Sequence, residues 1–112
     1  MIDGALREPT FLILTALAAR PQHGYGILRD VEEISDGRVR LRAGTLYTAL
    51  DRMGADGWVA VDREEVVDGR LRRYYRLTDQ GAARLEAEVQ RLRAHTRAAE
   101  QRLRARPQGG TA

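Results

Sequence analysis

The residues with the clearest capacity for chemistry lie on one short amphipathic segment, residues 43–55. Leu46, Leu50 and Met53 recur at about 100° per residue, so we expect a helix that buries this apolar face. The opposite face and its flanks carry small and polar residues that could contact phosphates or base edges: Gly44, Thr45, Tyr47, Thr48 and Arg52. N–H groups at a helix N-terminus favour phosphate, so the pattern indicates a helix that enters a DNA groove.

A basic hairpin is expected directly after this helix. Two β-type runs, residues 58–66 and 71–77, flank a tip at residues 68–70 that begins with Asp-Gly, a strong signal for a tight turn. Alternate residues of a strand share a face, so Arg70 and Arg72 are expected together beside the tip. Because arginine grips phosphate in bidentate fashion, we predict that both contact the DNA backbone. A helix followed by such a hairpin is the layout of a winged helix-turn-helix.

Three further residues are candidate DNA contacts. Arg40 and Arg42 come just before the helix at residues 43–55 and could add to its contacts. Tyr25 lies near the start of an earlier helix. Core packing is the safer expectation for Tyr25, with a contact surface or a ligand cavity as the alternatives.

Each candidate contact also has a purely structural alternative. Thr45 could cap a turn, Tyr47 could pack on the preceding helix, and Arg52 could pair with the acidic residue four positions later. The hairpin arginines could do no more than blunt an exposed edge strand. They could also be neutralised by acidic residues of the first hairpin strand: Asp62, Glu64 and Glu65. Residues 21–77 hold ten arginines and ten acidic residues, so only local clustering can favour DNA binding.

Two helices are expected ahead of the segment at residues 43–55. Pro9 suits a first helical turn, and the residues after it are apolar on nearly every side, as in a helix that is buried or shared between subunits. We therefore predict that Phe11 and Leu14 contribute to a dimer interface. A second helix is expected at residues 23–34, followed by a short strand or extended connector around residues 39–41.

A long helix is expected at residues 80–106, with Thr78-Asp79 as its N-terminal cap. At 1.5 Å per residue, the helix would be about 40 Å long. Its apolar positions alternate steps of four and three, as in a heptad seam: Leu85, Val89, Leu92, Thr96, Ala99 and Leu103. So long a helix would leave this seam exposed beside a small core, so we predict that it joins two subunits. Acidic residues such as Glu88 are expected on the flanks of the seam.

The chain as a whole is expected to be a single cytoplasmic domain with an appendage. Its 112 residues include no cysteine, which excludes disulfides and thiolate metal sites, and no metal or cofactor is predicted. No signal peptide is recognisable, and the apolar run at residues 11–19 is too short to span a bilayer. We expect a mainly α fold with a small β wing. A winged domain at residues 1–78 would precede a dimerisation helix at 79–106 and a disordered tail at 107–112.

These segments together resemble the PadR family of bacterial transcriptional regulators. The resemblance covers most of the chain and rests on four motifs in order: residues 6–14, 23–27, 44–53 and 68–78. It implies a homodimeric repressor that binds a pseudo-palindromic operator in double-stranded DNA and has a single C-terminal dimerisation helix. Some members release DNA when a small hydrophobic or aromatic effector binds near the dimer interface, in a pocket that tryptophan on the last helix helps to build. Here the only tryptophan, Trp58, lies at the start of the first hairpin strand instead.

Two other classes of function stay open on the residues alone. One is a winged-helix module that pairs with another protein and does not bind DNA, which the zero net charge of residues 21–77 favours. The other is a small-molecule carrier or enzyme that uses the cavity of a dimer. No Ser/His/Asp, paired-carboxylate or phosphate-loop pattern is recognisable, so we expect no enzyme.

Overall fold

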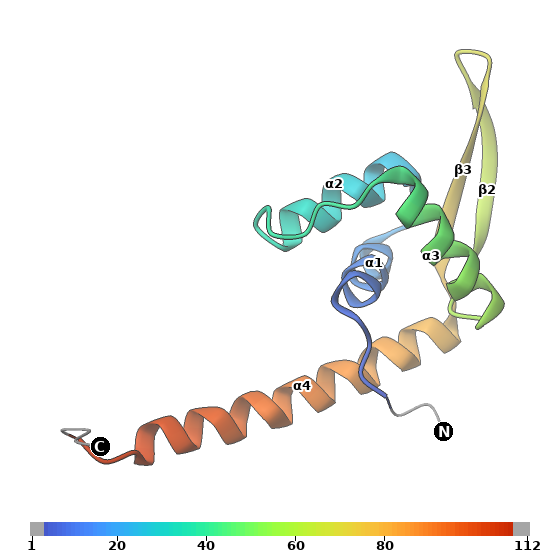
Figure 1. Ribbon diagram of the computed structural model, residues 1–112. Helices are drawn as coiled ribbons and strands as arrows, with labels where there is room; N and C mark the ends of the chain where they lie inside the picture. The colour runs from blue at the N-terminus through green and yellow to red at the C-terminus, as the bar shows by residue number, and fades with distance from the viewer. Residues whose placement is uncertain (1–3, 109–112) are drawn as a thin grey trace.

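The computed structural model describes residues 4–108 and is mainly helical, with one small antiparallel sheet in the order β1-β3-β2 (Figure 1). The elements are α1 (Glu8–Ala19), β1 (Gln22–His23), α2 (Gly24–Ile34), α3 (Ala43–Ala55), β2 (Val59–Val67), β3 (Arg70–Leu77) and α4 (Asp79–Ala105). Helices α1 to α3 lie together, the β2–β3 hairpin projects at one end of them, and α4 passes beneath α1 and extends away (Figure 1). The expected winged helix-turn-helix followed by a long helix is therefore confirmed.

The hydrophobic core lies where α1, α2 and α3 meet. Its buried members are Leu12, Ile13, Leu14, Leu17, Ile27, Val31, Leu46, Leu50, Met53 and Val59. α1 is central because it is apolar on nearly every side, as its sequence indicates. Leu14 is 0% exposed, so the prediction that it contributes to a dimer interface is wrong: its side chain has no surface left to contact a second subunit. Phe11, by contrast, is only partly buried against this core.

Two local details were not settled by the sequence. β1 is a two-residue strand that pairs with Tyr74 and Tyr75 of β3. Two residues are too few to show the alternation that marks a strand, so no sequence pattern indicates it. Residues 39–42 form no strand, and of the two expectations the extended connector is correct. The Ser35 hydroxyl oxygen anchors this connector by accepting a 2.9 Å hydrogen bond from the backbone N–H of Val39.

The β2–β3 hairpin, called the wing below, closes through the turn that its sequence predicts. Asp68 has a φ of 52° and Gly69 a φ of 76°. Two consecutive positive values are what a type I′ hairpin turn requires, and this turn matches the natural twist of the two strands. The strand pairing starts at Val67 and Arg70 beside the turn, and a bulge interrupts it at Asp62. The wing is therefore a rigid, twisted ribbon rather than an irregular loop.

α4 begins at the cap that its sequence predicts. The Thr78 hydroxyl oxygen accepts a 3.0 Å hydrogen bond from the backbone N–H of Gly81. A Cβ added to Gly81 would lie 2.9 Å from the carbonyl carbon of Trp58 and would collide with its oxygen. The first turn of α4 therefore approaches the backbone ahead of β2 more closely than a residue with a side chain would allow. This contact positions the start of α4 against the rest of the fold.

α4 ends one residue earlier than expected, at Ala105. Residues 107 and 108 are not helical, and residues 109–112 of the expected tail lie outside the described residues. Between residues 4 and 108, no helix is both long enough and apolar enough to cross a lipid bilayer.

Candidate nucleic-acid interface

α3 has the two faces that its sequence predicts. Leu46, Leu50 and Met53 are at most 2% exposed and belong to the core. The candidate contact residues on the other side are all exposed: Gly44, Thr45, Tyr47, Thr48 and Arg52. Within residues 4–108, Arg52 forms no ion pair with Asp56 or with any other acidic residue. The outer face of α3 therefore presents small residues near its start and a free guanidinium further along.

Tyr47 is held in place by a glycine of α2. A Cβ added to Gly24 would lie 2.8 Å from Cζ of Tyr47 and closer still to its hydroxyl oxygen. The ring therefore lies directly against the start of α2, which is the packing that the structural alternative expects. Tyr47 is nevertheless 45% exposed. Packing on α2 and an accessible surface for a partner are thus compatible at this residue.

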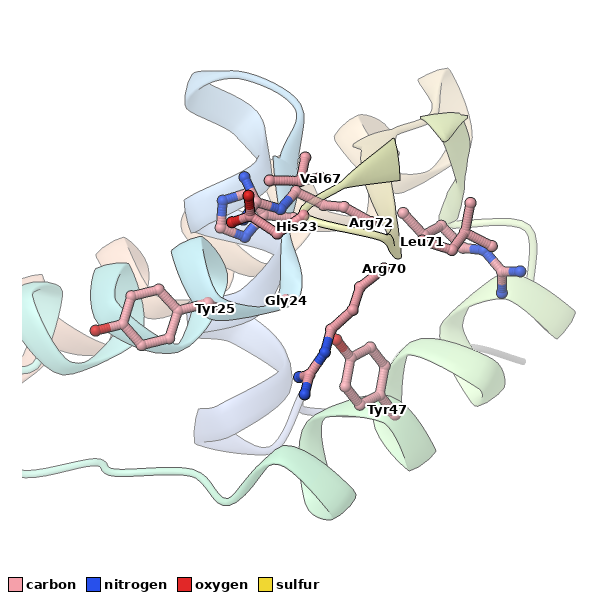
Figure 2. Close-up of a pocket in the computed structure, with 10 residues that line it drawn as sticks. His23, Gly24, Tyr25, Tyr47, Val67, Arg70, Leu71 and Arg72 are labelled. Carbon is pink, nitrogen blue, oxygen red and sulfur yellow. The ribbon is translucent and has the colours of Figure 1, made fainter. Parts of the chain in front are cut away.

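A cleft lies between the start of α2, α3 and the wing (Figure 2). Its volume is about 500 Å³, and it is lined by His23, Gly24, Tyr25, Tyr47, Val67, Asp68, Arg70, Leu71, Arg72 and Arg73. Figure 2 shows Arg70 reaching from the wing toward Tyr47 of α3, while Tyr25 lies on α2 at the opposite side. Three elements that are separate in the sequence thus bring cationic and aromatic side chains to one hollow.

Two acidic residues of β2 are engaged by neighbours on β3. Arg73 Nε donates a 2.8 Å hydrogen bond to Glu64, and this bond raises the pKa of Arg73. The Tyr74 hydroxyl donates a 2.8 Å hydrogen bond to Glu65. Both pairs are cross-strand contacts of the kind that stabilise an antiparallel ribbon.

The third acidic residue of β2 pairs within its own strand. Asp62 lies 3.2 Å from Nη1 of Arg63, whose guanidinium is 3.8 Å from the ring centroid of Tyr74. Arg70 and Arg72 have no ion-pair partner within residues 4–108. The acidic residues of β2 therefore do not neutralise these two arginines, and the cleft has a local positive charge that the overall charge balance conceals.

His23 connects the cap of α2 to the cleft. Its Nδ1 accepts a 3.2 Å hydrogen bond from the backbone N–H of Gly26, and its ring meets Tyr74 edge to face with centroids 5.3 Å apart. Burial lowers the pKa of His23, and the positive charge of Arg72 lowers it further. Only an unprotonated Nδ1 can accept the capping hydrogen bond, so the neutral imidazole is the form that this cap requires.

The other candidates are exposed, with different surroundings. Arg40 lies 3.5 Å from Glu32 in a solvent-exposed ion pair, and Arg42 is exposed at the N-cap of α3. Tyr25 is 65% exposed, so the expectation of core packing is wrong. It points away from the buried face of α2 and lines the cleft, with the Arg29 guanidinium 5.8 Å from its ring centroid. No cluster of three His, Asp or Glu side chains suited to a metal ion occurs in the part of the chain that the structure describes.

Gly24 lines the cleft, and the sequence does not indicate that it packs against Tyr47. Its role appears only when the Gly-Tyr motif of α2 is placed beside the Gly-Thr-Leu-Tyr motif of α3. The sequence offers one signal for this contact, which is that both motifs occur in the same chain. Neither motif by itself shows that the glycine of one packs against the tyrosine of the other. Tertiary contact is therefore needed to see that one motif positions the tyrosine of the other.

The helix pair α2 and α3, with a basic wing beside them, defines a winged helix-turn-helix protein. The chain belongs to the transcriptional regulator PadR-like family, whose sequence model matches residues 13–87. The proteins of this family are transcriptional regulators and not enzymes.

Individual relatives agree with this assignment. Transcriptional regulator Rv3488 of Mycobacterium tuberculosis (strain ATCC 25618 / H37Rv) is 48% identical over 54 residues, which are 48% of this chain and 50% of that protein. The match thus spans about half the length of this curated relative. The crystal structure of a PadR family transcription regulator from Clostridium difficile R20291 covers 87% of this chain and 99% of its own, with 27% identity and a TM-score of 0.72.

A more distant structure shares the fold. Bacillus subtilis PadR in complex with operator DNA is 20% identical, with a TM-score of 0.63. The alignment covers 95% of this chain and 54% of that one.

Proposed function

We propose that this chain is a homodimeric repressor that binds a pseudo-palindromic operator through α3 and the wing. The observation that supports this most directly is the pair of unneutralised arginines, Arg70 and Arg72, beside the exposed face of α3. The operator complex of Bacillus subtilis PadR supports the same kind of partner here. Such a role requires a cytoplasmic location.

The two parts of the interface have different tasks. The outer face of α3 enters the major groove, where Thr45, Tyr47, Thr48 and Arg52 are within reach of base edges and phosphates. Arg70 and Arg72 contact the phosphates alongside and release counterions, which contributes affinity without sequence preference. α3 therefore carries the sequence selectivity, and the wing carries much of the salt-dependent affinity.

The dimer interface is assigned to α4. Leu92 is 38% exposed and Leu103 63% exposed, and both leave apolar surface that the chain itself does not cover. A groove of about 370 Å³ brings Phe11 of α1 beside Val89 and Leu92. Thr96 and Ala99 continue this exposed seam, whereas Leu85 packs partly on the core of its own protomer.

Two such subunits would present their α3 helices to successive major grooves, roughly 34–36 Å apart on B-form DNA. A small hydrophobic or aromatic effector would release the operator by binding more tightly to a dimer whose α3 helices are not spaced for successive major grooves. α4 has no Phe, Tyr or Trp residue, so it lacks the tryptophan that would help to build a pocket for such a compound.

The test combines selection of bound DNA with a charge-matched pair of variants. Random fragments recovered with the purified protein are expected to contain an inverted repeat.

The Arg70→Ala/Arg72→Ala variant removes two phosphate contacts per subunit. Its log–log salt slope is therefore expected to be smaller by about 3.6 for the dimer, at about 0.9 per phosphate. Arg102→Ala/Arg104→Ala, at the far end of α4, changes the net charge equally and should leave the slope unchanged.

One observation favours a second function, a winged-helix module that binds protein instead of DNA. Residues 21–77 carry no net charge, so the net charge of this part of the chain does not attract DNA. If no fragment were recovered even at low salt, this second function would replace the first. An equal effect of both double variants would show that the wing arginines have no specific role.

A further inference from the structure

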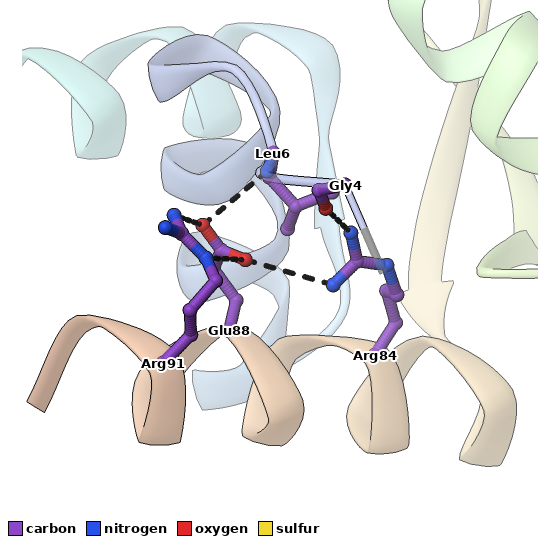
Figure 3. Close-up of polar contacts among 5 residues, drawn as sticks. All are labelled: Gly4, Leu6, Arg84, Glu88 and Arg91. Carbon is purple, nitrogen blue, oxygen red and sulfur yellow. Dashed lines mark hydrogen bonds and ion pairs between the residues drawn. The ribbon is translucent and has the colours of Figure 1, made fainter. Parts of the chain in front are cut away.

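A buried carboxylate lies on the helix that we assign to the dimer interface. Glu88 is 2% exposed and is the only charged residue that is buried among residues 4–108. The sequence places it on a flank of the seam, but its side chain points toward the segment that precedes α1 (Figure 3). An isolated buried charge is costly, so its partners must be specific.

The carboxylate oxygens of Glu88 are held from two sides. Nε of Arg91 donates to Oε1 at 3.1 Å, and a second nitrogen of the same guanidinium donates to Oε2. The backbone N–H of Leu6 donates to Oε2 at 3.3 Å, and Nη1 of Arg84 lies 3.7 Å from Oε1. These hydrogen bonds, that from Arg91 foremost, lower the pKa of Glu88 and keep it ionised.

Arg84 extends this cluster to two further segments. It donates a hydrogen bond to the backbone carbonyl of Gly4, and its guanidinium lies 5.6 Å from the ring centroid of Trp58. Figure 3 shows Glu88, Arg84 and Arg91 on α4 facing the backbone of Gly4 and Leu6. We call these five residues the Glu88 clasp. It joins α4 to the chain before α1 and, through Trp58, to the junction of α3 and β2.

The clasp lies near the point where α4 leaves the rest of the fold. Beyond Leu92, every described side chain of α4 is exposed except the partly buried Ala98. The helix between Arg91 and Ala105 is therefore a lever about 20 Å long. A tilt of roughly 10° at its base moves the far end by about 3.5 Å, close to the rise of one base pair.

We propose that Glu88 is a positioning residue for operator recognition: the clasp sets the direction of α4 and thereby the half-site spacing that the dimer accepts. This inference rests on the proposed dimeric, DNA-binding function. Glu88 itself touches no DNA. It acts on the separation of the two α3 helices, because each helix is joined to the dimer interface through the base of its own α4.

The test uses a set of operators whose half-sites are separated by spacers that differ by single base pairs. The wild type is expected to prefer one spacing. Glu88→Gln and Arg91→Gln are expected to lose this preference while they remain folded dimers. Glu86→Gln is the matched control, because it removes the same charge from an exposed position on the same helix and should keep the wild-type preference. Arg91 is 31% exposed at its side chain, so its replacement also provides a variant that can fold if Glu88→Gln does not.

A second measurement follows the direction of α4 without DNA. The chain has no cysteine, so spin labels at Asp51→Cys on α3 and Gln101→Cys on α4 report one distance within each subunit once labelled chain is diluted with unlabelled chain. The distance distribution is expected to broaden or shift with Glu88→Gln and to stay unchanged with Glu86→Gln. The inference is overturned if the clasp variants keep either the wild-type spacing preference or the wild-type distance distribution. Failure of the wild type to bind any inverted repeat would refute the proposed function instead.

Discussion

At the scale of single residues, two glycines show how the same absence of a side chain has different consequences. The space beside Gly24 is filled by the far end of the Tyr47 side chain, which can move. The space beside Gly81 is filled by the backbone of Trp58, which cannot move without displacing β2. Gly24 therefore controls where one aromatic ring lies, whereas Gly81 controls how closely two segments of backbone approach.

We expect Gly81→Ala to lower the free energy of unfolding by about 1–3 kcal/mol, because the added methyl group overpacks against a carbonyl that has no room to shift. Gly54→Ala is the control, since a Cβ there lies 4.0 Å from its nearest neighbour and α3 gains up to about 1 kcal/mol of helix propensity. Urea unfolding followed by circular dichroism measures both changes. A Gly81→Ala protein as stable as the wild type would contradict the close approach at the base of α4.

At the scale of elements, the start of α2 depends on a titratable cap. The folded protein lowers the pKa of His23 below its ordinary value of 6.5, so folding favours the neutral imidazole. The contribution to stability is therefore fully present above pH 6.5 and is lost as the pH falls through the folded-state pKa. The same ring lines the cleft beside Arg72, so the helix cap and the candidate interface share one residue.

His23→Asn replaces this cap with an acceptor that does not titrate. Between about pH 7.5 and 5.5, the wild type is expected to lose up to about 1 kcal/mol more stability than His23→Asn. Thermal unfolding of the free protein across this range measures the difference. His95→Asn, at an exposed position of α4, is the matched control and should follow the wild type. Parallel pH curves for the wild type and His23→Asn would show that the cap does not respond to protonation.

At the scale of the whole molecule, the main feature is the apolar seam of α4, which the chain itself leaves exposed. Leu92→Glu introduces a charge into that seam and is expected to give a monomer at micromolar concentration, whereas the wild type is expected to be a dimer. Gln90→Glu adds the same charge on the opposite side of α4 and should remain dimeric. Sedimentation equilibrium measures the mass, and the melting temperature of the wild type should rise with protein concentration. A dimer that survives Leu92→Glu would place the interface elsewhere.

The sequence by itself determined the parts of this protein whose signals are local. The buried and exposed faces of α3, the Asp-Gly turn of the wing and the Thr78 cap of α4 each depend on residues a few positions apart, and all are observed as predicted. The order and spacing of four such segments also sufficed to recognise the PadR-like family. Periodicity, turn chemistry and capping act over a few residues, so a single sequence contains them in full.

Only the tertiary structure decided which of these residues meet. Glu88 has the sequence pattern of a solvated position but is buried, because the segment before α1 lies across α4. Leu14 belongs to the core and not to an interface, and Tyr47 owes its position to Gly24. Arg70 and Arg72 have no ion-pair partner within residues 4–108, and this likewise depends on two of the wing's acidic residues being bound by Arg73 and Tyr74. Burial and pairing depend on residues that are distant in the chain, so no pattern among neighbouring residues predicts them.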